Sequence, residues 1–390
     1  MSVDAAVSPS TRADRALRDP ATSATLADRI ARLSEEAARA GADAVIVSPG
    51  ADLQYLLGHS VASHERLTCL VVDQDGTARL LVPHLERPGW DGTPVGDLGL
   101  DIGTWLDGED PYAAVADLLP PDARVLAVDN YLPAMHALGL QGAIPGSRLT
   151  LAGPAISELR MRKDSHEVAA LAAVGAAIDR VQRRIGEWLR VGRTEHEVAA
   201  DIAAALVEEG HEGADFVIVA SGPNGASPHH EVSDRVIGAG EPVVIDIGGP
   251  SRAGYYSDCT RTYVTGPAAP DDVAEVYDVV RAAQAAGVAA AVAGASCESV
   301  DAAARRVIVD AGYGAHFITR TGHGIGLEVH EDPYLVRGNA RPLEAGMAFS
   351  VEPGIYLPGR FGVRIEDIVV VTEAGPVRMN TCPTDLIVLD

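Results

Sequence analysis

The sequence predicts an α+β protein in which a small α/β domain precedes a larger C-terminal domain with a pseudo-twofold repeat. Two observations favour this class. Short apolar runs alternate with helical stretches up to about residue 150, as in a small α/β domain. After that point, the order of two helices followed by strands occurs twice. We therefore expect a mobile leader at residues 1–23, a first domain at 24–153 and a second domain at 154–390.

The first domain is expected to begin with a helix near Thr25, because apolar residues recur at helical spacing up to Ala37. Gly41 suits the C-terminal end of that helix. Further helices are expected near 112–119 and 131–139. Four apolar runs bounded by turn residues predict strands: DAVIVS, LTCLVVD, ARLLVP and ARVLAVD. The leader before this domain lacks the apolar segment of a secretory signal.

The second domain is expected to begin with helices over 154–210, the longest of them capped by Asp164 or Ser165. Thr194 and Glu197 have the spacing of a capping box for the last of these helices. Strand-like segments follow: FVIVASG, PVVIDIGG and YYSDCTRTYV. A second set of elements then has the same order: helices at 270–292 and 297–311, and strand-like segments to the end.

A shift of 102 residues relates the starts of the two sets. The positions Gly192, Thr194, Val198 and Gly210 match Gly294, Ser296, Val300 and Gly312. In each set, a hydroxyl side chain would cap a helix that ends at a glycine. Two ordinary capped helices would share part of this pattern, but the repeated order of elements favours a pseudo-twofold domain.

Bulk properties exclude several functions. A chain of 390 residues with a net charge of −24 is not expected to bind nucleic acid or anionic membranes. The sequence contains no apolar run of the length that a membrane span needs. Its four cysteines are scattered without metal-binding spacing, which is typical of reduced thiols in a cytoplasmic protein.

Four acidic residues lie inside apolar, strand-like runs: Asp246 in PVVIDIGG, Asp258 in YYSDCTRTYV, Glu352 in MAFSVEPGIY and Glu366 in GVRIEDIVVV. An unpaired carboxylate is very costly in a dry core. Four that converged would repel one another unless a charge of about +4 lay between them, and two divalent metal ions supply that charge. His323, in TGHGIGLEVHE, adds a nitrogen ligand. The sequence therefore predicts a two-metal site.

The spacing of the acids supports their convergence. Asp246 and Asp258 are an even number of residues apart around the turn PSRAG, so a hairpin would direct both to one face. Glu352 and Glu366 bracket the loop LPGRFG in the same way. Four carboxylates and an imidazole favour Mn²⁺, with Co²⁺, Zn²⁺ and Fe²⁺ as alternatives. Two such ions about 3.5–4 Å apart would share a water and lower its pKa to about 7. Taken singly, each acid could instead be a buried ion-pair partner, and His323 a turn residue.

Three neighbours of these ligands are assigned from strand alternation. Arg364 would share the face of Glu366, whereas Asp367 would point away and be structural. Cys259 would face away from Asp258 and is expected to be inert.

Two further histidines are candidates for substrate contact. His229 follows the loop SGPNGASP, and His330 lies seven residues after His323. A histidine in such a loop is commonly a surface residue, and a regular strand would place His330 on the other face from His323. Near metal ions, either imidazole could orient a substrate carbonyl or stabilise a tetrahedral intermediate.

The chain resembles the metal-dependent pita-bread (M24-type) peptidases, the group of methionine aminopeptidase, aminopeptidase P and prolidase, over about residues 25–390. The resemblance is carried by SGPNGASPHH, VVIDIGG, YYSDCTRT, TGHGIGLEVHE, SVEPGIY and RIEDIVVV. It implies a creatinase-like N-terminal domain, a pita-bread catalytic domain and a homodimer. The implied metal ligands are Asp246, Asp258, His323, Glu352 and Glu366. The implied catalytic residues are His229, His330 and Glu352. Of these, Glu352 would shuttle a proton, and Arg364 would bind the substrate.

Within the group, the chain most resembles bacterial Xaa-Pro dipeptidases, in particular those of actinobacteria. The expected activity is hydrolysis of the Xaa-Pro bond of dipeptides or short peptides by a metal-bridging hydroxide. One alternative is aminopeptidase P activity on longer peptides with proline at the second position. A second is creatinase-like hydrolysis of a small non-peptide molecule, which the complete ligand set disfavours. A third is a non-catalytic binding module built on the same fold.

Overall fold

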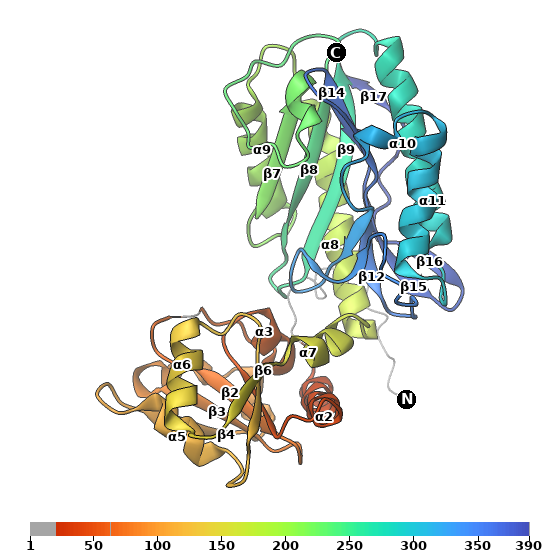
Figure 1. The fold of residues 1–390 in the computed structure, drawn as a ribbon. Coiled ribbons are helices and arrows are strands. Elements are labelled where there is room, and N and C mark those ends of the chain that lie inside the picture. The colour runs from red at the N-terminus through yellow and green to blue at the C-terminus, as the bar shows by residue number, and fades with distance from the viewer. Residues whose placement is uncertain (1–20, 63, 390) are drawn as a thin grey trace, which may run out of the picture. The chain divides into compact units, whose positions relative to one another are not determined.

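The structure is a computed structural model that describes residues 21–62 and 64–389. It divides into two compact units, one ending at Arg160 and the other beginning at Met161, and each unit is described by itself (Figure 1). The division falls after helix α7 (Gly153–Arg160), which packs on α2 (Ser23–Arg39), whereas the sequence places the boundary before this helix. Residues 1–20 of the expected leader lie outside the described residues, and Ser23 already begins α2.

The first unit is built on a six-stranded mixed sheet with the order β4-β3-β2-β1-β5-β6. Its strands are β1 (Ala44–Val47), β2 (Cys69–Asp73), β3 (Ala78–Pro83), β4 (Asp101–Trp105), β5 (Val125–Val128) and β6 (Arg148–Leu151). Its remaining helices are α3 (Ala51–Leu57), α4 (Pro94–Asp97), α5 (Pro111–Leu118) and α6 (Ala134–Ala143). The four predicted strands are confirmed. The two added strands, β4 and β6, are the partly exposed edges of the sheet, so they lack the apolar runs that mark the buried strands.

Four long helices organise the second unit: α8 (Ser165–Arg184), α9 (Glu195–Glu208), α10 (Asp271–Ala290) and α11 (Cys297–Asp310). Thr194 caps α9 in the capping box that the sequence predicts. Asp164, one of the two candidate caps, caps α8, and there too the capping box is complete, with Glu167. Helix α8 is followed by a 3-10 turn at Ile185–Glu187. None of the helices in the described part of the chain combines the length and apolarity that a bilayer crossing requires.

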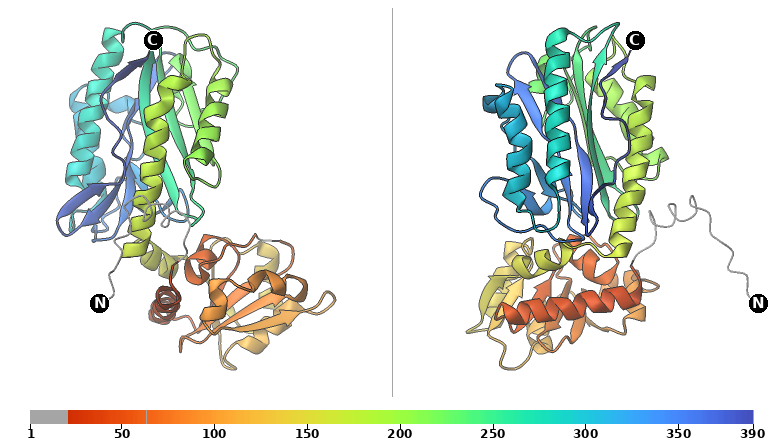
Figure 2. Two further views of the ribbon diagram at one scale, coloured as in Figure 1. Left: turned by 180° about the vertical axis from the view of Figure 1, so that it is seen from behind. Right: turned by 90° about the vertical axis from the view of Figure 1, so that its right-hand side faces the viewer.

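The strands of the second unit form three sheets. One has the order β17-β9-β8-β7, with β7 (Phe216–Ser221), β8 (Pro242–Pro250), β9 (Tyr256–Thr265) and β17 (Ile387–Leu389). The second has the order β11-β10-β12-β15-β16, with β10 (Gly322–Gly324), β11 (Glu331–Leu335), β12 (Ala348–Val351), β15 (Asp367–Thr372) and β16 (Gly375–Arg378). The third pairs β13 (Gly354–Leu357) with β14 (Phe361–Arg364). Figures 1 and 2 show α10 and α11 side by side, with α8 crossing behind β8 and β9.

Backbone hydrogen bonds repeat between the two halves of this unit. The amide of His211 donates to Leu206 after α9, and the amide of Tyr313 donates to Ile308 after α11, with the same shift of 102 residues. Before the helices, Gly192 donates to Ile237 and Gly294 donates to Leu343. Helices α9 and α11 have the same length of 14 residues, and both Gly210 and Gly312 have positive φ angles. The predicted pseudo-twofold repeat is therefore present in the backbone.

Because side chains alternate along a strand, one face of the sheet packs against the helices and the other face lines the cavity. On β8, Val243, Ile245 and Ile247 pack into the core formed with α8 and α9. Residues of the other parity, including Asp246, point to the opposite face. The fold thus leaves a cavity on this opposite face, and the Asp246 carboxylate lies in its wall.

Candidate metal centre

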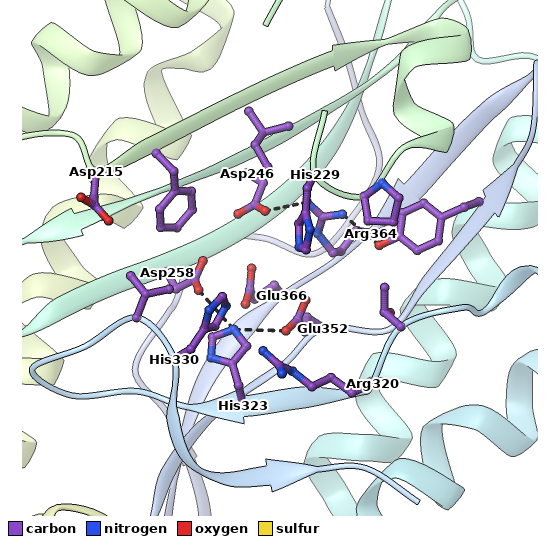
Figure 3. A pocket seen from close by; sticks show the side chains of 16 residues that line it. Asp215, His229, Asp246, Asp258, Arg320, His323, His330, Glu352, Arg364 and Glu366 are labelled. Atoms are coloured by element: carbon purple, nitrogen blue, oxygen red, sulfur yellow. Dashed lines mark hydrogen bonds and ion pairs between the residues drawn. The ribbon is translucent and has the colours of Figure 1, made fainter. Parts of the chain in front are cut away.

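A cavity of about 670 Å³ in the second unit brings all eight predicted site residues together (Figure 3). The five predicted ligands are Asp246, Asp258, His323, Glu352 and Glu366, and the three other residues are His229, His330 and Arg364. They come from both halves of the pseudo-twofold unit, so the cavity exists only when the two halves are assembled.

Strand register explains how the acids meet. On the β8–β9 ladder, Asp246 pairs with Thr260, and Asp258 lies two residues from Thr260 on the same face. The hydroxyl of Thr260 donates to Oε2 of Glu366 at 2.7 Å, which ties the acid between β14 and β15 to the first hairpin. Glu352 follows directly after β12, and its Oε1 accepts a hydrogen bond from Ser350 at 3.1 Å.

His323 is oriented for ligation. Its Nδ1 lies 3.1 Å from the carbonyl oxygen of Gly324, which only accepts, so Nδ1 carries the proton. The Nε2 lone pair therefore faces two carboxylate oxygens, at 3.2 Å from Glu352 and 3.6 Å from Asp258. Ligand atoms of Asp258, His323 and Glu366 all lie within 4.8 Å of one another. Three acceptors at this separation need a proton or a cation between them.

The pKa values of the buried acids also indicate that a cation is needed between them. Burial, followed by the negative charges of Glu366, Asp246 and Glu352, raises the pKa of Asp258 well above its usual value. Burial and the charges of Glu352 and Asp246 also raise the pKa of Glu366. Protein groups alone therefore do not stabilise four ionised carboxylates here, and cations between them would remove the repulsion.

Asp246 supplies a direct test of whether the residues fit a metal ion. Its Oδ1 is buried and has no hydrogen-bond partner within residues 21–62 and 64–389. Such a buried acceptor is rare unless water or an ion satisfies it. Its second oxygen accepts a hydrogen bond from Arg364 at 2.6 Å. The donor set of carboxylates and one imidazole fits divalent cations.

Arg364 lines the cavity, but all three guanidinium nitrogens are engaged by protein groups. Besides Asp246, they donate to the hydroxyls of Thr260 at 3.1 Å and Tyr356 at 2.9 Å. The side chain is only 3% exposed. This geometry favours a role in holding Asp246 and Tyr356 over the direct substrate contact that the resemblance implies.

The two predicted substrate histidines also reach the cavity. His330 packs edge-on against His323 with ring centroids 4.2 Å apart. The glycine-rich segment between them overrides simple strand alternation, since His330 follows β10 before β11 begins. Burial is the main cause that lowers the pKa of His330 to about 4, and the positive charge of Arg320 acts in the same direction, so this ring is neutral near pH 7.

Residues next to the ligands behave as strand alternation predicts. Asp367 is fully buried outside the cavity and pairs with Arg261 at 2.6 Å and Arg378 at 3.1 Å. Cys259 packs into the core on the helix side, with its sulfur 3.8 Å from that of Cys382. Both residues are therefore structural.

Sequence reasoning missed several residues of the cavity wall, of which Arg320 bears most on chemistry. Its guanidinium stacks over the ring of Tyr334 at 4.7 Å and adds a positive charge to the cavity. Thr319, Phe216 and Asp215 also line the wall, and the Thr319 hydroxyl has no partner within the described ranges. The only sequence signal for Arg320 is that it lies directly before the TGHGIG segment.

Comparisons with known proteins agree with this geometry. Residues 169–373 match metallopeptidase family M24, and residues 29–162 match the creatinase/prolidase N-terminal domain. The chain is 49% identical to a probable dipeptidase PepE of Mycobacterium tuberculosis, covering 93% of this chain and 96% of that protein. It is 36% identical to an Xaa-Pro dipeptidase of Lactobacillus helveticus, covering 85% of this chain and 91% of that protein. The crystal structure of dipeptidase PepE from Mycobacterium ulcerans is similar with a TM-score of 0.90, at 48% identity, covering 95% of this chain and all of that one.

Proposed function

The chain belongs to metallopeptidase family M24, with a creatinase/prolidase N-terminal domain before the pita-bread domain, and on this premise we propose that it is a two-metal Xaa-Pro dipeptidase. The family makes it a hydrolase that uses divalent metal ions, and its dipeptidase relatives imply small peptide substrates. The proposal adds the proline specificity, the two ions and the role of each residue.

The observation that carries the proposal is the partly satisfied carboxylate of Asp246 among the other four ligands. One of its oxygens is fixed by Arg364, whereas the other is buried and unpaired within the described residues. Asp246, Asp258, His323, Glu352 and Glu366 would hold the ions. When bound, two divalent ions would lower the pKa of a shared water and polarise the substrate carbonyl.

The chain's own residues would handle the proton and the developing negative charge. Glu352 is less buried than the other acids and is hydrogen bonded to Ser350, so it is placed to carry a proton between the attacking water and the leaving nitrogen. His330, neutral near pH 7, and His229 on the opposite wall would donate hydrogen bonds to the substrate carbonyl oxygen.

The cavity also contains groups that suit the two ends of a dipeptide such as Xaa-Pro. Phe216 and Tyr356 give it apolar surface on which a proline ring could pack. Arg320 supplies a guanidinium that would pair with the terminal carboxylate of the dipeptide. A cation for that carboxylate favours a dipeptidase over an enzyme that acts on longer peptides.

A substrate panel tests the proposal. Metal-stripped enzyme would be assayed with Ala-Pro, Ala-Pro-Ala and Ala-Ala, each with and without added Mn²⁺. We expect Mn²⁺-dependent release of proline from Ala-Pro, and little hydrolysis of the other two peptides. Faster cleavage of Ala-Pro-Ala would indicate aminopeptidase P activity instead. No cleavage of any peptide by metal-loaded enzyme would contradict the proposal and favour a non-peptide substrate or a binding role.

We further propose Mn²⁺ as the preferred ion, since four of the five ligands are hard carboxylate oxygens. We also propose that the enzyme is a homodimer and that it is located in the cytoplasm. The free, buried state of all four cysteines is consistent with a reducing compartment.

A further inference from the structure

The carboxylate of Glu195 is the centre of a hydrogen-bond cluster that no part of the proposed mechanism uses. Glu195 occupies the first position of α9, and its side chain is fully buried. All of its donors come from the segment 221–235, which we call the His229 loop. The donors are the amide and hydroxyl of Ser221, the side-chain amide of Asn224, Nε2 of His230, and the amide and hydroxyl of Ser233, at 2.7–3.2 Å.

This cluster requires a charged acceptor. An ionised carboxylate only accepts hydrogen bonds, whereas an amide in its place would turn an NH₂ group toward other donors. Burial acts to raise the pKa of Glu195, but the hydrogen bonds from Ser221, Ser233 and His230 outweigh it and lower the pKa to about 2. The N-terminal turn of α9 also favours a negative charge at this place.

The contacts bracket His229 along the chain. Asn224 binds Glu195 ahead of it and His230 binds Glu195 directly after it, while His229 itself lines the cavity. The other side of the loop is closed by β14. A Cβ atom at Gly362 would lie 1.9 Å from the carbonyl oxygen of Gly225, so these two backbones are in close contact. The loop is therefore held between α9 and β14, with little freedom for the backbone next to His229.

The other half of the repeat shows that the architecture does not need this carboxylate. The position that matches Glu195 after the shift of 102 residues is Cys297, whose amide makes the equivalent backbone hydrogen bond. Cys297 is buried in an apolar cluster with Val300 and Phe349. A buried anion is thus found in the half that carries His229, and a small thiol occupies the same place in the half that does not.

We propose that Glu195 is a positioning residue that fixes the His229 loop and so aims the His229 imidazole into the cavity. The inference rests on the proposed function, in which His229 contacts the substrate. Glu195 does not line the cavity, and its effect on turnover is transmitted through His229.

The test is a double-mutant cycle on the full-length, Mn²⁺-loaded enzyme. Glu195→Gln is expected to lower kcat for Ala-Pro by about 10²-fold, because a misplacement of about 1 Å has an effect of that size. The bound Mn²⁺ should be unchanged. In a His229→Ala background, Glu195→Gln should lower kcat by less than about threefold, because the group it positions is already gone. The matched control is Glu197→Gln, two residues along the same helix and 58% exposed, which should leave kcat unchanged.

Hydrogen exchange of the peptides covering 221–235 gives a readout that needs no substrate. Glu195→Gln should speed exchange in this loop and leave β8 and β9 unchanged, and Glu197→Gln should do neither. If Glu195→Gln does not yield folded protein, Ser233→Ala, which removes one of the donor hydroxyls, should show the same pattern at smaller size.

The outcomes separate the two proposals. A wild-type kcat in Glu195→Gln, an equal loss in both backgrounds, or unchanged exchange in the loop would overturn the role of Glu195. Absence of turnover in the wild-type enzyme would instead overturn the proposed function, and the exchange measurement would still decide whether Glu195 holds the loop.

Discussion

Arg364 donates from Nη2 to Oδ2 of Asp246 at 2.6 Å and leaves Oδ1 of the same carboxylate facing the cavity. One oxygen is therefore fixed in place by a buried guanidinium, and the other is available to a cation. The same guanidinium reaches Tyr356 and Thr260, so a single side chain organises one wall of the site. Loss of the Arg364 contact should therefore disturb the oxygen of Asp246 that would bind the cation.

Arg364→Lys should weaken Mn²⁺ binding by roughly 10–100-fold, the usual effect of losing a group that orients a metal ligand. Lysine keeps the charge, but its three donors sit on one nitrogen, so it cannot span the three acceptors that Arg364 reaches from three separate nitrogens. Calorimetric titration of metal-stripped protein with Mn²⁺ measures the change. The matched control is Arg360→Lys, at an arginine that is 56% exposed on the same hairpin. Equal affinities in both variants would show that Arg364 does not support Asp246.

Asp258→Asn and Glu366→Gln should each abolish turnover of Ala-Pro, because both carboxylates lie at the centre of the acidic cluster. Metal analysis should find fewer bound ions per chain than in the wild-type protein. Asp385→Asn, at a carboxylate that is 77% exposed, is the control and should change neither quantity. A near-wild-type rate in either ligand variant after metal reconstitution would rule out the two-metal assignment.

Arg320→Met should lower kcat/KM for Ala-Pro by roughly 10–100-fold, since a hydrogen bond to a charged group contributes about 1.5–3 kcal/mol. The effect on Ala-Pro amide, which has no carboxylate, should be much smaller. The ratio of kcat/KM for the two substrates is the measurement, and Arg337→Met, at an exposed arginine, is the control. Equal losses on the acid and the amide would mean that Arg320 does not bind the carboxylate.

His211 should make the folding stability depend on pH. It is buried between the carbonyl of Leu206 and the hydroxyl of Ser257, and burial lowers its pKa from 6.5 to about 4. Unfolding therefore takes up a proton between these pH values, so the contribution of His211 is complete above pH 6.5 and is lost as the pH falls toward 4. The size is about 3 kcal/mol.

Urea unfolding of wild-type protein and His211→Gln at pH 7.5 to 4.5 tests this dependence. The variant should be less stable at pH 7.5, and its free energy of unfolding should decline less steeply with falling pH. Parallel curves for the two proteins would contradict the assignment of the pH dependence to His211.

Much of the fold could be predicted because its signals are local. The capping box of Thr194 and Glu197 depends on side chains three residues apart, and it is confirmed, as is Asp164 as one of the two candidate caps of α8. Helix α6 begins at Ala134, later than its apolar pattern suggests, because Pro133 disfavours a helical residue before it. Strands β4 and β6 were not predicted, since an exposed edge strand needs no apolar run.

The site could be predicted only in part. The four acids stand out because a charge in an apolar strand conflicts with its context, and His323 stands out in its glycine-rich segment. The structure gathers these five residues in one cavity, while their roles stay proposals. The roles of Glu195 and Arg320 could not be recognised, because their partners are distant in the chain. The hydrogen-bond donors to Glu195 lie 26 to 38 residues away, and Tyr334, on which Arg320 stacks, lies 14 residues away. The partner of the single lysine, Lys163, is likewise visible only in the structure, where it forms a buried ion pair with Glu331.

The most direct test of the central claim is a titration of metal-free enzyme with Mn²⁺, following bound metal and proline release from Ala-Pro in the same samples. The two-metal account predicts saturation at two ions per chain, with turnover rising as the second ion binds. Full turnover with one ion or none, or two bound ions without proline release, would contradict it.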